Sequence, residues 1–163
     1  MNRLSLAMLA ALALQGCAGA NHAPDEALPV EKVYASSQCS GLEQPETVWI
    51  ADAAAWRRRY AQMMNLQITP PPLPVVDFSH DGVLLIAMGQ QTTGGYGLNL
   101  AGTSATVREG VLTVRVEWRE PLPGYAQTQV MTSPCLLVKL PDRAFSRIWI
   151  VDQEGRVRLE GVR

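Results

Sequence analysis

Few side chains in this chain could carry out catalysis or hold a metal ion. The sequence contains two histidines, His22 and His80, and three cysteines, Cys17, Cys39 and Cys135. No His, Cys or Asp residues recur at the spacing of a metal site, and one histidine alone cannot complete a zinc site. Cys135 could act as a nucleophile only with a nearby base and an accessible thiolate. We therefore expect a protein that is not an enzyme and that holds no metal and no cofactor.

His80 stands in the polar segment Ser79-His80-Asp81-Gly82, directly before an apolar run. A histidine beside a serine could in principle orient a nucleophile. A polar turn that precedes a buried strand accounts for the same residues, and we favour this interpretation. His22 lies in a small, polar stretch near the N-terminus, where we expect it to be solvated.

The N-terminal residues indicate acylation of Cys17. Arg3 is followed by an apolar run from Leu4 to Leu14. A short charged N-terminal region, an apolar stretch of about ten residues and small residues before the cleavage site are typical of a secretory signal. The run is too short to span a bilayer, which takes about 20 residues. The segment Leu14-Gln15-Gly16-Cys17 resembles the lipobox of bacterial lipoproteins. It implies a signal peptide over residues 1–16 and a lipidated Cys17; a plain secretory signal is the alternative.

The residue after Cys17 bears on where the protein is sorted. It is Ala18, not aspartate, and in lipoproteins that resemble this chain at the signal this favours the outer membrane over the inner one. Stable anchoring needs more than one acyl chain, and lipoprotein-type modification would supply several. We expect a cell-envelope protein that is bound through its lipid anchor to the outer membrane and faces the periplasm.

Cys39 and Cys135 remain as an even pair, and an oxidising compartment favours a disulfide between them. The two residues lie 96 positions apart. A bridge that closes such a loop stabilises a fold by about 4 kcal/mol in the chain-entropy description. The alternative is two buried free thiols, since free cysteine is also among the most buried residue types.

The mature chain is long enough for one domain with a substantial core. Removal of residues 1–16 from the 163 leaves 147 residues. Residues 17–29 are expected to form the lipidated cysteine and a flexible tether, because the stretch 18–28 is small, polar and aperiodic. A single globular domain is expected over residues 30–163.

From residue 75 onward the pattern is that of β-strands. Residues 83–88 form a continuous apolar run between two glycines, which fits a strand buried on both faces. Residues 112–119 alternate between apolar and polar, as a half-buried strand does. The hairpin turn Asp152-Gln153-Glu154-Gly155 offers a glycine for a left-handed position. The other expected strands lie within 30–35, 47–50, 96–100, 127–131, 136–140, 148–151 and 156–159.

One helix is expected, in the N-terminal half of the domain. Asp52 is a suitable N-cap for a helix that begins at Ala53 and runs to residue 64. The prolines within 69–74 predict an extended connector after it. Because alternating strands need a second layer, the expected fold class is mainly β (α+β). We expect an antiparallel β-sandwich or barrel-like sheet with the helix on an edge or end.

The number and distribution of charged residues argue against nucleic acid as a partner. The chain carries 14 Lys and Arg against 15 Asp and Glu, and loss of Arg3 with the signal leaves a net charge of about −2. No basic stretch or stripe suggests a surface for nucleic acid. No small-molecule substrate is evident either, so the expected partners are the membrane and a protein.

The best candidate for a binding site is the loop Gln90 to Tyr96. It leaves the apolar run of 83–88 and enters an alternating segment. Adjacent glycines permit positive φ and close backbone approach, while the Gln and Thr side chains offer uncharged donors and acceptors. The loop 121–125 is its possible neighbour, and Tyr125 would be a second aromatic contact. The alternative is an ordinary turn with a packed tyrosine. The predicted partner-binding residues are Gln90, Gln91, Thr92, Thr93, Gly94, Gly95, Tyr96 and Tyr125.

Three stretches together resemble the C-terminal domain of the PrcB protease-complex-subunit family. They are VLLIAMGQQTTGGYGLNL, LTVRVEWREPLPG and TSPCLLVKLP, which fall between Val83 and Pro141. The residues that match the family pattern are Gly89, Thr93, Gly94, Gly95, Tyr96, Pro121, Gly124, Ser133 and Pro134. The resemblance implies a non-catalytic domain that associates with or supports a protease. Residues 30–74 lie outside it.

A fainter resemblance links residues 91–96 to the Asn-Pro-Thr-Thr-Gly-Tyr loop of chagasin-like cysteine-protease inhibitors, which are β-sandwiches. This chain lacks the Asn-Pro pair, has an extra glycine before Tyr96, and has no later Arg-Pro-Trp. Protease inhibition is therefore the alternative function, together with a structural role in the envelope. The main expectation is a protein-binding lipoprotein whose partner is a protease or another envelope protein.

Overall fold

The computed structural model of the protein describes residues 25–163. The predicted signal peptide over 1–16, Cys17 and most of the predicted tether lie outside the described residues. Within residues 25–163 no helix is both long and apolar enough to cross a membrane.

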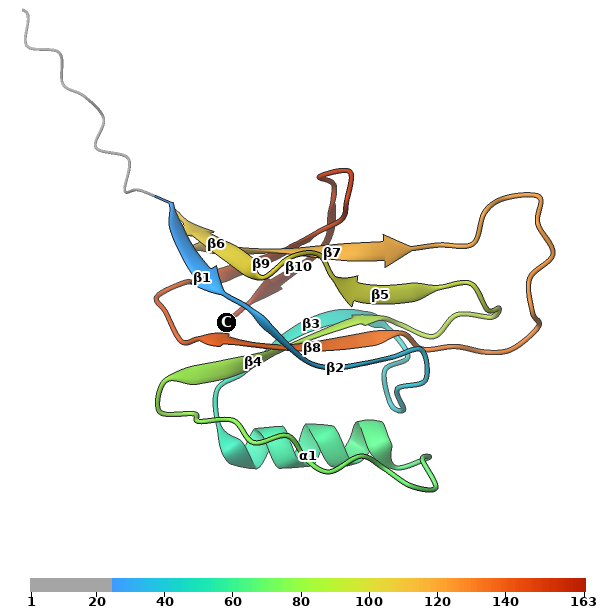
Figure 1. The fold of residues 1–163 in the computed structure, drawn as a ribbon, viewed down its shortest axis with the longest axis horizontal. Coiled ribbons are helices and arrows are strands. Elements are labelled where there is room, and N and C mark those ends of the chain that lie inside the picture. Colours follow the sequence, from blue (N-terminus) through green and yellow to red (C-terminus); the bar gives the residue numbers. More distant parts are fainter. Residues whose placement is uncertain (1–24) are drawn as a thin grey trace, which may run out of the picture.

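The described residues fold into two β-sheets and one helix, stacked in three layers (Figure 1). One sheet has six strands in the order β1-β6-β7-β9-β10, with β5 also pairing with β7. Its strands are β1 (Glu26–Pro29), β5 (Gly97–Leu100), β6 (Ser104–Arg108), β7 (Val111–Arg119), β9 (Arg147–Val151) and β10 (Val157–Val162). The other sheet has four strands in the order β2-β8-β4-β3. These are β2 (Glu31–Ser36), β3 (Pro45–Ile50), β4 (Asp81–Met88) and β8 (Cys135–Pro141).

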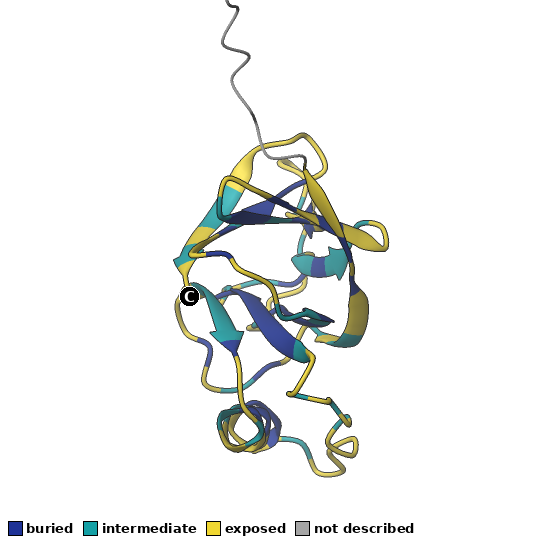
Figure 2. Cartoon of the chain, turned by 90° about the vertical axis from the view of Figure 1, so that its left-hand side faces the viewer, coloured by how far each residue is buried: buried dark blue, intermediate teal, exposed yellow. Residues whose placement is uncertain are grey.

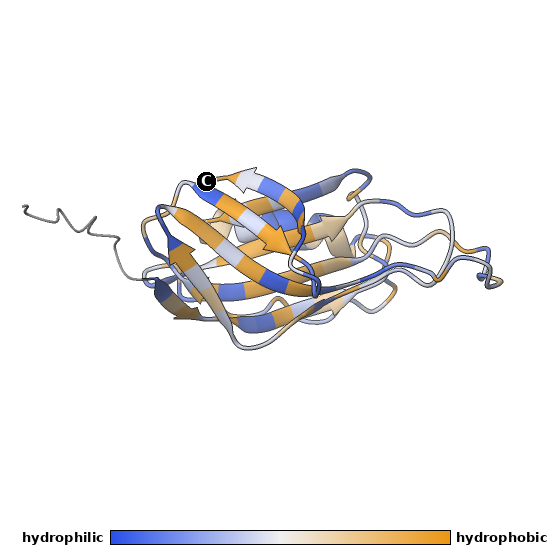
Figure 3. Cartoon of the chain, turned by 90° about the horizontal axis from the view of Figure 1, so that it is seen from above, coloured by the Kyte–Doolittle hydropathy of each residue, from blue (hydrophilic) through white to orange (hydrophobic). Residues whose placement is uncertain are grey.

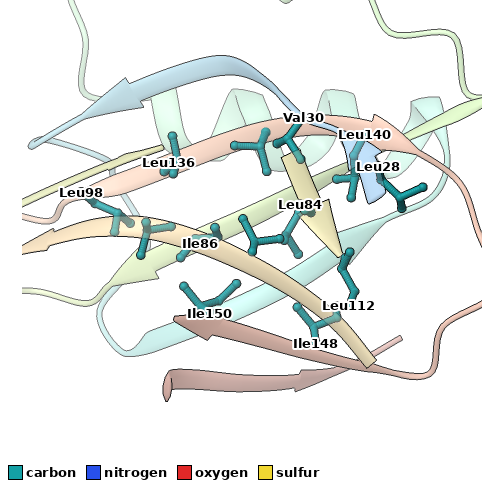
Figure 4. Close-up of a cluster of buried hydrophobic side chains, with 14 of the residues drawn as sticks. Leu28, Val30, Leu84, Ile86, Leu98, Leu112, Leu136, Leu140, Ile148 and Ile150 are labelled. Atoms are coloured by element: carbon teal, nitrogen blue, oxygen red, sulfur yellow. The ribbon is translucent and has the colours of Figure 1, made fainter. Parts of the chain in front are cut away.

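The two sheets pack face to face as an open sandwich and do not close into a barrel. Apolar side chains of both sheets meet between them, among them Leu84 and Ile86 of β4 and Leu112 of β7 (Figure 4). Figure 2 shows the buried residues gathered in the strands of this interior. The predicted mainly β fold, in its sandwich form, is therefore confirmed.

Helix α1 (Ala53–Met64) covers the outer face of the four-stranded sheet. The Asp52 carboxylate caps it, accepting hydrogen bonds from the amides of Ala54 at 2.9 Å and Ala55 at 2.8 Å. Trp56 and Met63 pack on this face of the sheet within a second buried cluster. The predicted bounds and cap are confirmed, but the predicted position on an edge or end is wrong.

The continuous apolar run of β4 explains where the helix packs. Val83 and Leu85 point to the helix, while Leu84 and Ile86 point to the other sheet. Successive side chains of a strand point to opposite faces, so a strand with no polar residue needs cover on both sides. The helix supplies the second cover, which confirms that this strand is buried on both faces.

Three further features differ from the sequence prediction. β1 lies within the predicted tether, because Leu28 is buried and the strand pairs with β6; the folded region therefore begins at Glu26, not at residue 30. Residues 127–131 form a loop instead of a strand. The pairing of β7 with β9 is parallel, while the other pairs are antiparallel.

The two ends of the sandwich carry different features (Figures 1 and 3). β1 begins at one end, where Glu26 pairs with Arg143 of the β8–β9 connection at 3.2 Å. At the opposite end lie the connections 37–44, 89–96 and 120–134. We call this the loop end.

Candidate functional site

The predicted binding loop is held along its length by the connection between β7 and β8. The amide of Gln91 donates to Thr132 O at 2.7 Å, and the amide of Thr132 donates back to Gln91 O at 2.9 Å. The amide of Gly94 donates to Thr128 O at 2.9 Å. The Thr132 hydroxyl donates to Thr93 O at 3.0 Å. The loop is therefore a fixed surface and not a free hairpin tip.

The eight residues predicted to bind a partner differ in their exposure. Gln90, Thr92, Gly95 and Tyr125 are exposed, Gln91, Thr93 and Tyr96 are half-buried, and Gly94 is buried. Tyr96 packs against the core between the sheets, as the structural alternative for this residue expects. Tyr125 keeps 71% of its surface exposed, which makes it the aromatic side chain of this set that a partner can reach.

Gly95 shows that the two predicted loops are neighbours. Its φ is +90°, and a Cβ on it would lie 2.6 Å from Gln127 Oε1 and 3.0 Å from Pro121 Cβ. The loop 121–125 therefore reaches the same end of the sandwich as loop 90–96. A glycine is needed here both for the positive φ and for the close approach of the two loops.

The loop end also exposes apolar side chains that the sequence reasoning missed. Leu122, Val130 and Met131 are exposed on the 120–134 connection, and Leu66 is exposed after helix α1. A signal for them is present in the sequence. Within residues 25–163, four runs of ten or more residues contain no Asp, Glu, Lys, Arg or His: 33–42, 60–76, 82–107 and 121–138. Each of the three connections at the loop end takes most of its residues from one of these runs.

The predicted disulfide between Cys39 and Cys135 is formed, with 6.1 Å between the Cα atoms. Both cysteines are buried. The bridge ties the 37–44 connection to the first residue of β8, directly beside the candidate surface. Cys135 is consequently no free nucleophile.

His80 lies in an exposed turn with Ser79 and Asp77. Its Nδ1 lies 2.9 Å from Ser79 Oγ and 2.8 Å from Asp77 Oδ2. In a Ser-His-Asp relay, the serine and the aspartate engage different ring nitrogens, so this cluster has another geometry. Hydrogen bonds from Ser79 and then His80 hold the pKa of Asp77 at about 2, and the same Asp77 contact raises the pKa of His80. Within residues 25–163, no three His, Cys, Asp or Glu side chains gather as a metal site would require.

Comparison with protein families gives one match. The family model described as PrcB C-terminal matches residues 83–141, a segment that holds both loop 90–96 and the 120–134 connection. Searches among curated proteins and among solved structures each found no match. The resemblance inferred from the sequence is confirmed over these residues, and it suggests a role associated with a protease complex.

Proposed function

We propose that the protein is a non-catalytic lipoprotein of the outer membrane that binds a protease or its complex through the loop end. The observation that carries this proposal is the pair of hydrogen-bonded, uncharged loops 90–96 and 120–134. The 120–134 loop exposes Leu122, Tyr125 and Met131 at this end of the sandwich. The PrcB C-terminal match over the same loops supports a protease complex as the class of partner.

The composition and stiffness of this surface suit protein recognition. The cores of protein–protein interfaces are depleted in charge and enriched in aromatic residues and methionine. A surface that is already fixed by hydrogen bonds loses less entropy on binding than a mobile loop. The exposed threonine side chain of Thr92 and the amide of Gln90 add uncharged donors and acceptors at its border.

Capture of the partner from solubilised envelopes tests the surface. Tyr125→Ala should weaken capture roughly tenfold, as loss of a well-placed aromatic contact does. Thr92→Ala with Thr93→Ala should weaken it by roughly as much, while the melting temperature stays nearly unchanged because no described hydrogen bond uses either hydroxyl. The matched control is Thr103→Ala with Ser104→Ala, an exposed polar pair on the six-stranded sheet.

The activity of the captured protease separates the proposal from its alternatives. A protease-associated subunit co-purifies with one protease and leaves it active. A chagasin-like inhibitor blocks a purified protease with simple dose dependence, and a structural lipoprotein captures none. Wild-type capture by the threonine double variant would show that the polar side chains of the loop do not carry recognition.

The anchor is tested separately from the binding surface. We expect intact-mass measurement of the mature protein to find acyl chains on Cys17 and no residues before it. Cys17→Ser should release the protein from the membrane fraction. A Cys17→Ser form that still fractionates with membranes would contradict the anchor without touching the binding proposal.

A further inference from the structure

We propose that a hollow of about 490 Å³ at the loop end accepts one uncharged, apolar side chain of the bound protein. The inference rests on the proposed function, since Gln90 and Met131 belong both to the hollow and to the candidate binding surface. It adds the chemistry of the contact: an aliphatic or aromatic side chain on a segment without neighbouring charges.

The hollow is built by segments that are far apart in the sequence. Its base includes Leu42 and the disulfide-bonded Cys39, which are 1% and 2% exposed. Leu66, from the turn after helix α1, and Met131, from the 120–134 connection, line it as well. These two side chains are 82% and 55% exposed, so the hollow has apolar surface that water now covers.

Hydrogen bonds between the lining segments fix the shape of the hollow. The amide of Cys39 donates to Ser133 O and the Ser133 hydroxyl donates to Leu42 O, both at 3.0 Å. The amide of Gln90 donates to Glu43 O at 3.0 Å. The disulfide holds the same two segments covalently. A hollow fixed in this way needs little rearrangement when a side chain enters it.

The charges around the hollow define its occupant. Glu43 is the one ionisable side chain among the residues that line it in the described chain, and the polar remainder are serines, threonine and glutamines. Glu43 is exposed, so it repels an anion and adds little to the binding of a cation, and an ion that enters the hollow loses hydration that this one charge does not replace. An apolar side chain loses no such hydration, and the rim amides of Gln38 and Gln90 can meet the backbone on either side of it.

The position of the hollow favours a protein over the membrane as the source of this side chain. β1, and with it the route to Cys17, begins at the opposite end of the sandwich. An anchored molecule therefore carries the hollow on the end away from its own point of attachment. A protein bound at the loop end reaches it directly.

A titration with single-residue amides tests the hollow without any knowledge of the partner. The neutral probes are N-acetyl-leucinamide and N-acetyl-phenylalaninamide. The charged probes are N-acetyl-lysinamide and the α-amide of N-acetyl-glutamate, which keeps its side-chain carboxylate. All are added to the purified disulfide-bonded protein. The neutral probes should shift the methyl resonances of Leu66 and Met131 saturably at millimolar concentration. The charged probes should shift neither.

Two matched pairs of variants locate the binding. Leu66→Ser should abolish the probe-induced shift of the Met131 methyl resonance, and Met131→Ser should abolish that of the Leu66 methyl resonances. Their neighbours Ile68→Ser and Val130→Ser, which are also exposed but do not line the hollow, should leave them intact. The same two lining variants should weaken partner capture roughly tenfold, and Ile68→Ser, which lies outside both the hollow and the 120–134 loop, should not.

The proposal is overturned if the charged probes bind as well as the neutral ones. It is also overturned if no probe shifts Leu66 or Met131, or if Leu66→Ser binds the neutral probes like the wild type. If the wild type captures no protease, the proposed function fails while the titration still decides whether the hollow takes an apolar side chain.

Discussion

Gly95 combines two structural demands that a pair of variants can separate. Its φ of +90° disfavours any other residue, and a Cβ on it would crowd Pro121 Cβ at 3.0 Å and the end of the flexible Gln127 side chain at 2.6 Å. Gly102 has nearly the same φ, +94°, but nothing lies within 4 Å of its Cβ position. We expect Gly102→Ala to cost about 1 kcal/mol, the strain of a left-handed non-glycine residue. Gly95→Ala should cost about 1–2 kcal/mol more because the loops must move apart.

Urea denaturation of the two glycine variants measures this difference. Equal losses in the free energy of unfolding would mean that the loops 90–96 and 121–125 separate freely. In that case loop 121–125, which carries Tyr125, would not be held against loop 90–96.

Asp152 is the buried carboxylate of the β9–β10 hairpin. Its side chain has no exposed surface and accepts hydrogen bonds from the amides of Glu154 at 3.0 Å and Arg156 at 2.9 Å. Burial raises its pKa, but the hydrogen bonds and the charge of Arg156 outweigh burial and leave the pKa below the ordinary 3.8. The turn that the sequence predicted at 152–155 is confirmed, with Gly155 at a φ of +83°.

A lowered pKa in the folded state makes the contribution of Asp152 dependent on pH. The stabilisation is complete above the unfolded-state pKa and is lost as the pH falls below about 4. We expect Asp152→Asn to lower the free energy of unfolding at pH 7 by about 1–3 kcal/mol. The variant should also flatten the decline of stability in acid. Glu154→Gln, which changes an exposed partner of Arg156, is the control. If both variants lose stability in acid as the wild type does, Asp152 does not cause the acid decline in the free energy of unfolding.

At the scale of elements, the disulfide ties the 37–44 connection, which joins β2 to β3, to the first residue of β8. β2 ends at Ser36, and three residues later Cys39 is bonded to Cys135 at the start of β8. We expect Cys39→Ala with Cys135→Ala to lower the free energy of unfolding by about 2–4 kcal/mol. Chemical denaturation of the variant, and of wild type before and after reduction, measures this loss.

The same double variant tests the hollow, because the bridge lies at its base. The neutral amide probes should bind the folded double variant more weakly than they bind the folded wild type, with both measured where the same fraction of molecules is folded. Cys17→Ser, which changes a cysteine outside the bridge, is the control. An unchanged stability after reduction would show that hydrogen bonds, such as those of Ser133 and Gln90, hold the 37–44 connection without the bridge.

Sequence patterns predicted the elements whose signal is local. The N-cap at Asp52, the alternation of 112–119 and the apolar run of 83–88 each lie within one element, and all three are confirmed. β1 was missed because four residues with one buried side chain carry no periodicity, and β6 supplies its pairing from about 80 positions away. The parallel β7–β9 pair was missed because β8, in the opposite sheet, separates the two strands in the chain.

The candidate site shows the same division between local and distant information. Residue types alone singled out loop 90–96, since adjacent glycines, glutamines and threonines are contiguous there. Leu66 and Met131 line one hollow although 64 residues separate them in the sequence. Only the fold brings them together, although the absence of charge in four separate runs is a sequence signal from which a shared surface could have been inferred.

At the scale of the whole molecule, the order of the strands places the start of β1 and the loop end at opposite ends of the sandwich. β1 enters at one end beside the β8–β9 connection, as the pair Glu26–Arg143 shows. β2, β4 and β7 all run from that end towards the loop end. If Cys17 is lipidated, the chain that leaves the membrane meets the domain at its near end, and the uncharged loops lie at the far end.

Fluorescence quenching on vesicles tests this orientation. A probe on Ala144→Cys, in the exposed connection beside β1, should be quenched by spin-labelled lipids more strongly than a probe on Leu122→Cys at the loop end. The physical reason is distance: from Cys17 to Glu26 the chain spans at most about 30 Å when fully extended, so the near end stays close to the lipid while the length of the sandwich separates the loop end from it. Partner capture by vesicle-bound protein should then equal capture by the Cys17→Ser form. Stronger quenching at Leu122 than at Ala144, or loss of capture on vesicles, would show that the apolar loops lie on the membrane, and the partner at the loop end would then be lipid instead of protein.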